Sequence, residues 1–63
     1  MYKIGFKFKV SKNNLIGEVM GVSFAGIYNV IFWENDRVYM TAAVHEETIT
    51  NNIKYGFYEA LNQ

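Results

Sequence analysis

The stretch that decides the fold runs from Leu15 to Trp33 and reads LIGEVMGVSFAGIYNVIFW. Two runs rich in β-branched and aromatic residues meet at Ala25-Gly26, and the second run ends on the single tryptophan of the chain. Such residues favour strands, and a short link that contains Gly is typical of a hairpin turn. We therefore expect a β-hairpin that forms the central pair of a small antiparallel sheet.

The turn allows two registers of the hairpin. A turn of two residues, Ala25-Gly26, would place Phe24 opposite Ile27, whereas a turn of three residues that begins at Phe24 would place Val22 opposite Tyr28. We favour the second register, because glycine tolerates the positive φ that this turn needs at its last position. It predicts that one face of the hairpin holds Met20, Val22, Tyr28, Val30 and Phe32.

The opposite face of the predicted hairpin mixes polar and apolar residues. It holds Gly17, Val19, Gly21, Ser23, Ile27, Asn29, Ile31 and Trp33. A sheet with one face in water shows clean alternation, whereas a strand that is covered on both sides does not. Something is therefore expected to cover this second face, either the C-terminal segment or another copy of the protein.

Length and composition predict a single small domain that spans residues 1–63. A chain of 63 residues buries a limited core, and the absence of cysteine removes disulfides and cysteine-based zinc sites as sources of stability. Hydrophobic residues make up 51% of the chain and aromatic residues 17%, which excludes a disordered chain. An aromatic core and oligomerisation are the two remaining ways to stabilise it.

Charge and hydropathy narrow the class of function. The net charge is zero, which disfavours an acidic DNA mimic and a dedicated duplex binder, although Lys3, Lys7, Lys9 and Lys12 gather at the start without an acid among them. No apolar run approaches the roughly 18 residues of a membrane span, and no export signal precedes the first predicted strand. We expect no membrane association and a cytoplasmic protein.

The segments around the hairpin are predicted to complete a meander. Residues 2–11 alternate regularly, with Tyr2, Ile4, Phe6, Phe8 and Val10 on one side and lysines on the other. Residues 12–14 and 34–36 are rich in Asn and Asp and are predicted turns. Residues 37–43 are a predicted strand with Val38, Met40 and Ala42 inward and Arg37, Tyr39 and Thr41 outward.

After Val44 the spacing of apolar residues changes from the alternation of a strand to the repeat of a helix. Ile49 and Ile53 are four residues apart, and acids at Glu46 and Glu47 favour a helix start, so we expect a short helix over residues 46–55. Gly56 is well placed to end it. Residues 57–61 then form a fifth strand or, alternatively, continue the helix. We favour a helix that ends at Gly56 and is followed by the strand.

This order of strand, hairpin, strand, helix and last strand resembles an SH3-like barrel, and more loosely the short orphan proteins of bacteriophage genomes. The residues behind the resemblance are Gly17-Glu18-Val19, Ile27-Tyr28-Asn29-Val30 and Ile53-Lys54-Tyr55-Gly56-Phe57. The resemblance implies a mainly β fold (α+β), an antiparallel meander or SH3-like barrel of four to five strands with one short C-terminal helix. The groove motifs of proline-peptide-binding SH3 domains are absent, so that ligand preference does not carry over.

Catalytic signatures are weak. His45-Glu46-Glu47 lacks the second histidine or cysteine of a metal site and the nucleophile of a catalytic site, and is typical of a solvated helix start. Gly17, Gly21 and Gly26 precede no helix that could cradle a phosphate. We expect no enzymatic activity, no metal and no cofactor.

The first functional hypothesis is a non-enzymatic protein that docks on another protein and forms a homo-oligomer. The phage-like resemblance implies an inhibitor of a host or defence protein in the host cytoplasm. The predicted protein-binding residues are Trp33, Tyr39, Ile27 and Arg37, with aromatics as anchors and the charge fixing orientation.

Two alternatives stay open. A single-stranded nucleic-acid binder would use Lys3, Lys7 and Lys9 for the backbone and Tyr39 for base stacking. An oligomer that sequesters a small nucleotide-like ligand is compatible with the aromatic content and the scattered lysines.

Overall fold

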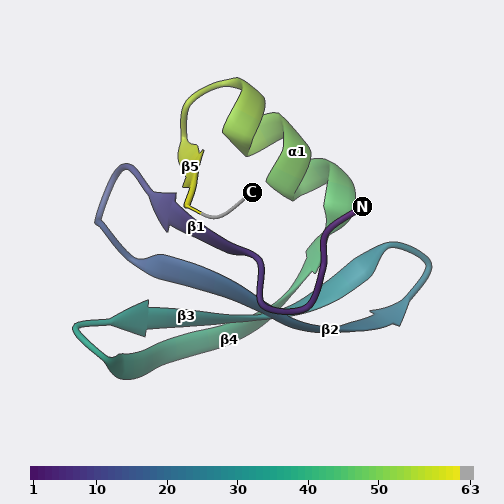
Figure 1. Cartoon of the computed structure of the whole chain (residues 1–63), viewed down its shortest axis with the longest axis horizontal. Helices are drawn as coiled ribbons and strands as arrows, with labels where there is room; N and C mark the ends of the chain where they lie inside the picture. The colour runs from purple at the N-terminus through teal and green to yellow at the C-terminus, as the bar shows by residue number, and fades with distance from the viewer. Residues whose placement is uncertain (62–63) are drawn as a thin grey trace.

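The computed structural model of the protein describes residues 1–61. Five strands and one helix follow in the order β1 (Lys7–Val10), β2 (Ile16–Phe24), β3 (Ile27–Glu34), β4 (Arg37–His45), α1 (Glu46–Lys54) and β5 (Tyr58–Ala60). All neighbouring strands are antiparallel and form one sheet in the order β4-β3-β2-β1-β5. The expected mainly β chain with one short C-terminal helix is confirmed. The sheet is open, with β4 and β5 as its two edges (Figure 1).

The hairpin turn has two residues, so the favoured three-residue turn is wrong at the tip. Ala25 has φ 45° and Gly26 has φ 78°, the pair of positive values that a type I′ turn requires, and Phe24 pairs with Ile27. Ala25 accepts a left-handed backbone because this turn matches the right-handed twist of the strands that it joins.

Two β-bulges in β2 then change the register. The first inserts Ser23 and brings Val22 opposite Tyr28, as the favoured register predicted, and the second inserts Met20. Because each bulge reverses the alternation of faces, Val19 is fully buried in the core whereas Met20 is 43% exposed. The assignments of Met20 to the inner face and of Val19 to the outer one are therefore wrong.

The core lies between the sheet and α1. Helix α1 packs over one face of the sheet, which we call the inner face, and Ile49 of the helix is fully buried there (Figure 1). The other buried hydrophobic residues are Phe8, Leu15, Val19, Tyr28, Val30 and Phe32. The C-terminal segment thus covers the face of Tyr28, Val30 and Phe32, so its expected place over the opposite face, that of Ile31 and Trp33, is wrong.

Gly17 is required by the packing of Phe8. The two residues are cross-strand partners, and a Cβ at Gly17 would lie 2.3 Å from the Phe8 ring. The ring fills the space above the glycine, stacks on Tyr58 at 4.4 Å between centroids and meets Phe32 edge-on at 6.0 Å. This aromatic row joins β5, β1 and β3 across the inner face.

The first strand is shorter than predicted. Only Lys7–Val10 is strand, because a turn at Ile4-Gly5, with φ 93° at Gly5, interrupts the alternation. As a result the Ile4 side chain points outward and is 70% exposed, so the predicted inward position of Ile4 is wrong. Tyr2 and Phe6 still pack against the core.

Strand β4 also departs from its predicted alternation. A bulge at Tyr39 separates the Phe32–Met40 pair from the Trp33–Val38 pair. Val38 therefore shares the face of Trp33, and Tyr39 lines the inner side together with Met40. The predicted inward Val38 and outward Tyr39 are both wrong, whereas Ala42 inward and Thr41 outward are confirmed.

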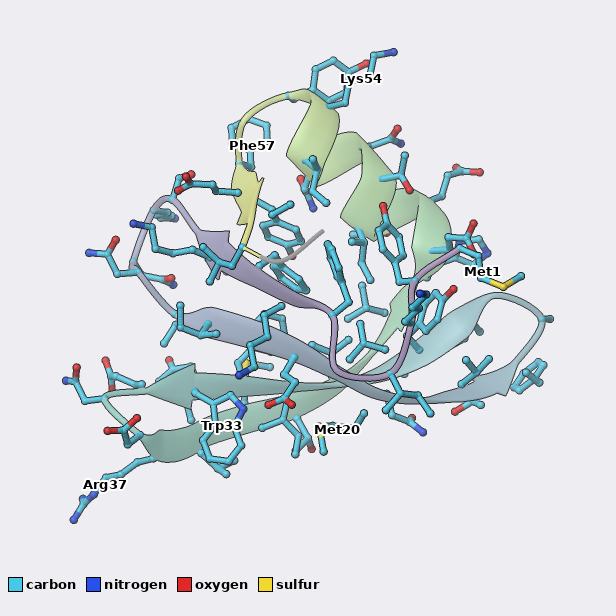
Figure 2. All side chains as sticks on the ribbon, viewed as in Figure 1. Met1, Met20, Trp33, Arg37, Lys54 and Phe57 are labelled. Carbon is cyan, nitrogen blue, oxygen red and sulfur yellow. The ribbon has the colours of Figure 1, made fainter. Side chains whose placement is uncertain are left out.

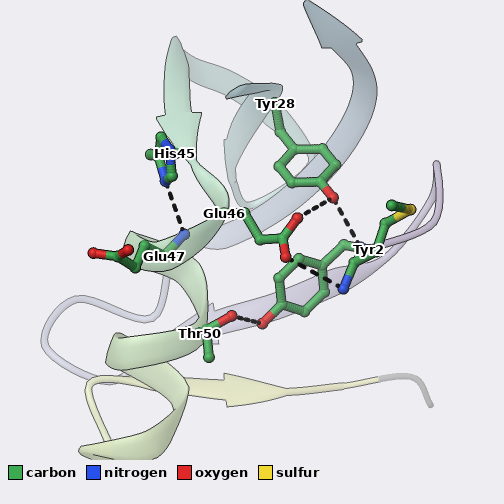
Figure 3. A network of polar contacts seen from close by, with 7 residues as sticks. Tyr2, Tyr28, His45, Glu46, Glu47 and Thr50 are labelled. Atoms are coloured by element: carbon green, nitrogen blue, oxygen red, sulfur yellow. Dashed lines mark hydrogen bonds and ion pairs between the residues drawn. The ribbon is translucent and has the colours of Figure 1, made fainter. Parts of the chain in front are cut away.

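Helix α1 begins and ends close to the predicted limits. His45 is its N-cap, since Nδ1 accepts a hydrogen bond from the Glu47 backbone N–H at 3.1 Å (Figure 3). After the helix, Gly56 has φ 84°, the left-handed conformation that stops it. The predicted break before a fifth strand is confirmed.

A polar network ties the N-terminal segment and the helix to the sheet (Figure 3). The buried Tyr28 hydroxyl accepts from the Tyr2 backbone N–H at 3.0 Å and donates to Glu46 Oε1 at 3.1 Å. The Tyr2 hydroxyl lies 2.7 Å from Thr50 Oγ1, and the Met1 amine lies 3.5 Å from Glu46 Oε2. Tyr28 thus has partners for its hydroxyl inside the core.

No helix within residues 1–61 is long and apolar enough to cross a lipid bilayer.

Candidate protein-binding face

The face of the sheet that points away from α1, here the outer face, is not covered by the described part of the chain. Cross-strand partners project on the same side, so register defines its rows. One row contains Ile16, Trp33 and Val38, and the next contains Ile31 and Thr41. Figure 2 shows Trp33 and Met20 on the side of the sheet opposite the helix.

Apolar side chains gather on the outer face over β2, β3 and β4. We call Ile16, Met20, Ile31, Trp33 and Val38 the outer patch. Met20 is 43% and Val38 54% exposed, and the remaining three are partly exposed. Contiguous exposed apolar surface of this kind marks interaction sites in small proteins.

Trp33 is held in a defined orientation within the outer patch. Its indole N–H donates to Glu18 Oε1 at 3.1 Å across the β2–β3 pair. The ring is therefore fixed against the sheet before any partner arrives, which lowers the conformational entropy lost on binding. Trp33 combines a large apolar surface with little remaining freedom, the properties of an interface anchor.

The outer face is hollowed next to Ile31 of β3. A shallow depression of about 440 Å³ lies between Met20 and Ile31 and is bordered by Thr41 and Ala43 of β4. The small side chains of β4 leave this space open. A depression with apolar sides can receive an apolar side chain from another protein.

Charged residues border the outer patch on its β1 side. Lys7 stands opposite Glu18, and Lys9 forms an ion pair with Glu59 at 3.9 Å. Arg37, at the β3–β4 turn, lies at the other end of the face (Figure 2). The arrangement is an apolar centre with a charged rim, as in protein interfaces.

The predicted protein-binding residues do not form one cluster. Trp33 and Arg37 lie at the same end of the hairpin formed by β3 and β4. Ile27 is on the outer face but six residues from Trp33 along β3, about 20 Å at the rise of a strand. Tyr39 is 58% exposed on the inner side. Trp33 and Arg37 are brought together, whereas Ile27 and Tyr39 are not.

Sequence reasoning missed Met20 and Val38, which complete the outer patch. Regular alternation predicts both residues on the inner face, but bulges at Met20 and Tyr39 interrupt the two strands and reverse the alternation. The only signal in the sequence is that both strands carry more apolar residues than one buried face needs.

The predicted nucleic-acid-binding residues lie far apart. Lys7 and Lys9 project from β1 on the outer face and have acidic neighbours, while Lys3 precedes the strand. Tyr39 lies on β4, three strands from β1, and faces the inner side. The basic residues and the stacking residue therefore do not line one groove.

The inner face opens into a groove between β4 and β5. This groove has a volume of about 510 Å³ and includes Phe32, Tyr39, Met40 and Tyr58 in its wall. His45 is its only ionisable group besides the two tyrosines, among the described residues that line it. Without Lys or Arg in this wall, nothing there is suited to a nucleotide phosphate.

No group of three or more His, Cys, Asp or Glu residues within residues 1–61 is arranged to hold a metal ion. Comparison of the chain with protein-family models, with curated proteins and with solved structures finds no match. The outer face, with its apolar patch and charged rim, is thus the best-supported candidate site on structural grounds alone.

Proposed function

We propose that the protein is a non-enzymatic binding module that docks on another protein through the outer patch, with Trp33 as its anchor. The observation that carries this proposal is the position of Trp33. It lies among exposed apolar side chains on the face without a helix, and Glu18 fixes its indole at 3.1 Å. A rigid, partly desolvated Trp is the residue type most enriched in interface hot spots.

The partner should present an apolar protrusion rather than a charged strip. The depression between Met20 and Ile31 accepts one apolar side chain. Trp33 follows Ile31 by two residues in β3 and therefore projects on the same face. Arg37, Lys7 and Lys9 at the rim would favour acidic residues around that protrusion and steer the encounter. Most of the affinity should come from the apolar centre, so binding should persist at raised salt.

The proposal includes an SH3-like barrel architecture and a role as an inhibitor of another protein. An SH3-like barrel that is left open between β4 and β5 is supported by the order of elements, with the helix between the last two strands. Docking by a phage-type module would inhibit a host or defence protein by occupying its surface, in the cytoplasm of the host. No chemistry by the module is needed for that effect.

The experiment is a capture assay with matched surface variants. The immobilised protein is exposed to a lysate of cells in which it is made, and retained proteins are identified and purified. Trp33→Ala and Met20→Glu should abolish retention of the partner, whereas Phe57→Ala should retain it. Phe57 is a suitable control because it is 62% exposed and lies beside α1, away from the outer patch (Figure 2).

Binding to the purified partner should then follow the outer patch quantitatively. We expect Trp33→Ala to weaken the complex by about 2 kcal/mol or more, roughly thirtyfold, as at other interface hot spots. Circular dichroism checks that each variant is folded. Docking through this patch would be contradicted if Phe57→Ala and Trp33→Ala lowered the affinity for the partner equally, or if moderate salt dissociated the complex.

A further inference from the structure

A pocket of about 600 Å³ lies at the end of the sheet where the β1–β2 and β3–β4 turns come together (Figure 1). Ile16 and Trp33, which are cross-strand partners on the outer face, supply its apolar surface. Its volume is in the range of small-molecule sites, about 300–1,000 Å³. The polar residues that line it are Lys7, Asn14, Glu18, Asn35 and Asp36. The pocket therefore combines one aromatic ring with several hydrogen-bonding side chains.

The indole of Trp33 is suited to stack against the ring of a ligand. Its N–H donates to Glu18 Oε1 at 3.1 Å, which fixes the ring, and the indole is partly exposed. A fixed aromatic surface of this kind can pack against a flat heterocycle. It can also pack against the face of a pyranose ring, whose weakly positive C–H hydrogens meet the negative π-face of the indole. The polar residues of the pocket decide between these two ligands.

The charges that line the pocket favour an uncharged ligand. Lys7 and Glu18 are cross-strand partners of opposite charge on one face of the sheet, so they largely balance each other. Asp36 is the third charged residue among the described residues that line the pocket, which leaves a net charge of one negative. A phosphate group would meet this negative charge, and the single cation, Lys7, already faces Glu18. A cationic ligand would in turn be repelled by Lys7.

The hydrogen-bonding groups of the pocket suit a ligand with several hydroxyls. Asn14 and Asn35 each offer amide N–H donors and a carbonyl acceptor, whereas the carboxylate of Asp36 only accepts. A hydroxyl can donate to a carboxylate and accept from an amide, so it matches both kinds of side chain. The polar side chains also come from two separate turns, Asn14 from one and Asn35 and Asp36 from the other. A pyranose carries hydroxyls around its whole ring, whereas a nucleobase carries its polar groups along its edge.

We propose that this pocket binds a neutral saccharide, with one face of a sugar ring on Trp33 and its hydroxyls bonded to Asn14, Asn35 and Asp36. The backbone holds these polar residues in defined turns. Asn35 and Asp36 have φ 49° and 67°, as in a type I′ turn, and Asn14 has φ 62°. Side chains that are placed by a turn need little ordering when a ligand binds.

This saccharide site goes beyond docking on a protein through the outer patch. It shares Ile16 and Trp33 with that patch but extends from them to the turns. The depression between Met20 and Ile31, which is proposed to receive a side chain of the protein partner, contains neither Ile16 nor Trp33. Substitutions in the turns and in the depression can therefore separate the two activities.

The test is a titration of the full chain with neutral sugars, followed at the site itself. Trp33 is the only tryptophan of the chain, so its fluorescence and its indole N–H resonance report on the pocket directly. The probes are glucose, galactose and N-acetylglucosamine, with sorbitol as a control that has hydroxyls but no ring. At least one of these sugars should give a saturable change with a Kd of about 1 mM, as expected for a ligand of this size. Sorbitol should give none.

A variant in the turn tests the polar side of the site without loss of the fold. Asp36→Gly removes the carboxylate and leaves asparagine followed by glycine, the preferred pair for a type I′ turn. It should weaken sugar binding by about tenfold, because hydrogen bonds to a charged acceptor are lost, whereas Phe57→Ala should bind the sugar as the wild type does.

Three results would overturn the proposal: no saturable change with any of the three sugars, saturation by uridine but by none of them, or unchanged sugar affinity in Asp36→Gly. Met20→Glu, which should abolish docking on the protein partner, should leave sugar binding unchanged. Asp36→Gly should in turn leave capture of the partner unchanged. The saccharide site and the docking proposal therefore fail independently.

Discussion

Replacing Gly17 with alanine should destabilise the fold, because the new methyl group would overlap the ring of Phe8. The added Cβ would lie 2.3–2.8 Å from three ring atoms, where ordinary contact is 3.4–4 Å. The ring has no free space to move into, since Phe8 is fully buried and stacks on Tyr58 at 4.4 Å. The strain must be taken up by shifting β1 or by distorting the core.

The size of the effect follows from two opposing contributions. Overpacking a close-packed core costs about 1–3 kcal/mol. Alanine also restricts the unfolded chain more than glycine does, which raises the free energy of unfolding by about 0.4–1 kcal/mol. The net loss of unfolding free energy should be about 1–2 kcal/mol, which for a domain of this size corresponds to a fall in Tm of roughly 5–15 °C.

Gly21→Ala is the matched control, in the same strand. The nearest atom to a Cβ at Gly21 is Asn29 Nδ2 at 4.0 Å, so this substitution meets no steric barrier. Thermal and urea unfolding followed by circular dichroism, at one protein concentration, should leave Gly21→Ala within about 0.5 kcal/mol of the wild type. If Gly17→Ala and Gly21→Ala unfold at the same midpoint, the steric reasoning is refuted.

A double-mutant cycle locates the strain at the ring. In a Phe8→Leu background the planar ring is gone, so adding Gly17→Ala should cost clearly less than it does in the wild type. An unchanged cost in that background would mean that the alanine acts through the backbone rather than through Phe8.

Other substitutions test the polar contacts that join the helix to the sheet. Tyr28→Phe removes a buried hydroxyl that bridges Tyr2 and Glu46, and should lower the unfolding free energy by about 1–2 kcal/mol, whereas Tyr55→Phe, at an exposed position, should change urea unfolding little. His45→Ala removes the N-cap acceptor and should cost about 1 kcal/mol, while His45→Asp keeps an acceptor and should retain most of the stability. Equal losses for alanine and aspartate would show that the cap does not contribute.

Much of the local structure is encoded in short stretches of the sequence. The pairs Ala25-Gly26 and Asn35-Asp36 adopt positive φ at both positions, as hairpin turns require. The acids at the start of α1 and Gly56 after its end set the limits of the helix within a residue or two. Such features depend on neighbours in the chain, so the sequence indicates where the chain turns and where the helix lies. The number of residues in the Ala25-Gly26 turn was not among them, because Gly26 suits both turn lengths and the pairing of Phe24 with Ile27 decides between them.

The faces of the strands were decided only in the tertiary structure. Alternation predicts a face as long as no bulge intervenes, and the bulges at Met20, Ser23 and Tyr39 each reverse it. Their positions depend on how β2 and β4 curve around the core, which no local pattern contains. For the same reason Val19 is buried while Met20 and Val38 join Trp33 outside. The sequence by itself determined the turn at residues 34–36, the helix and the surplus of apolar residues. Packing of the sheet against α1 decided which of those apolar residues stay exposed.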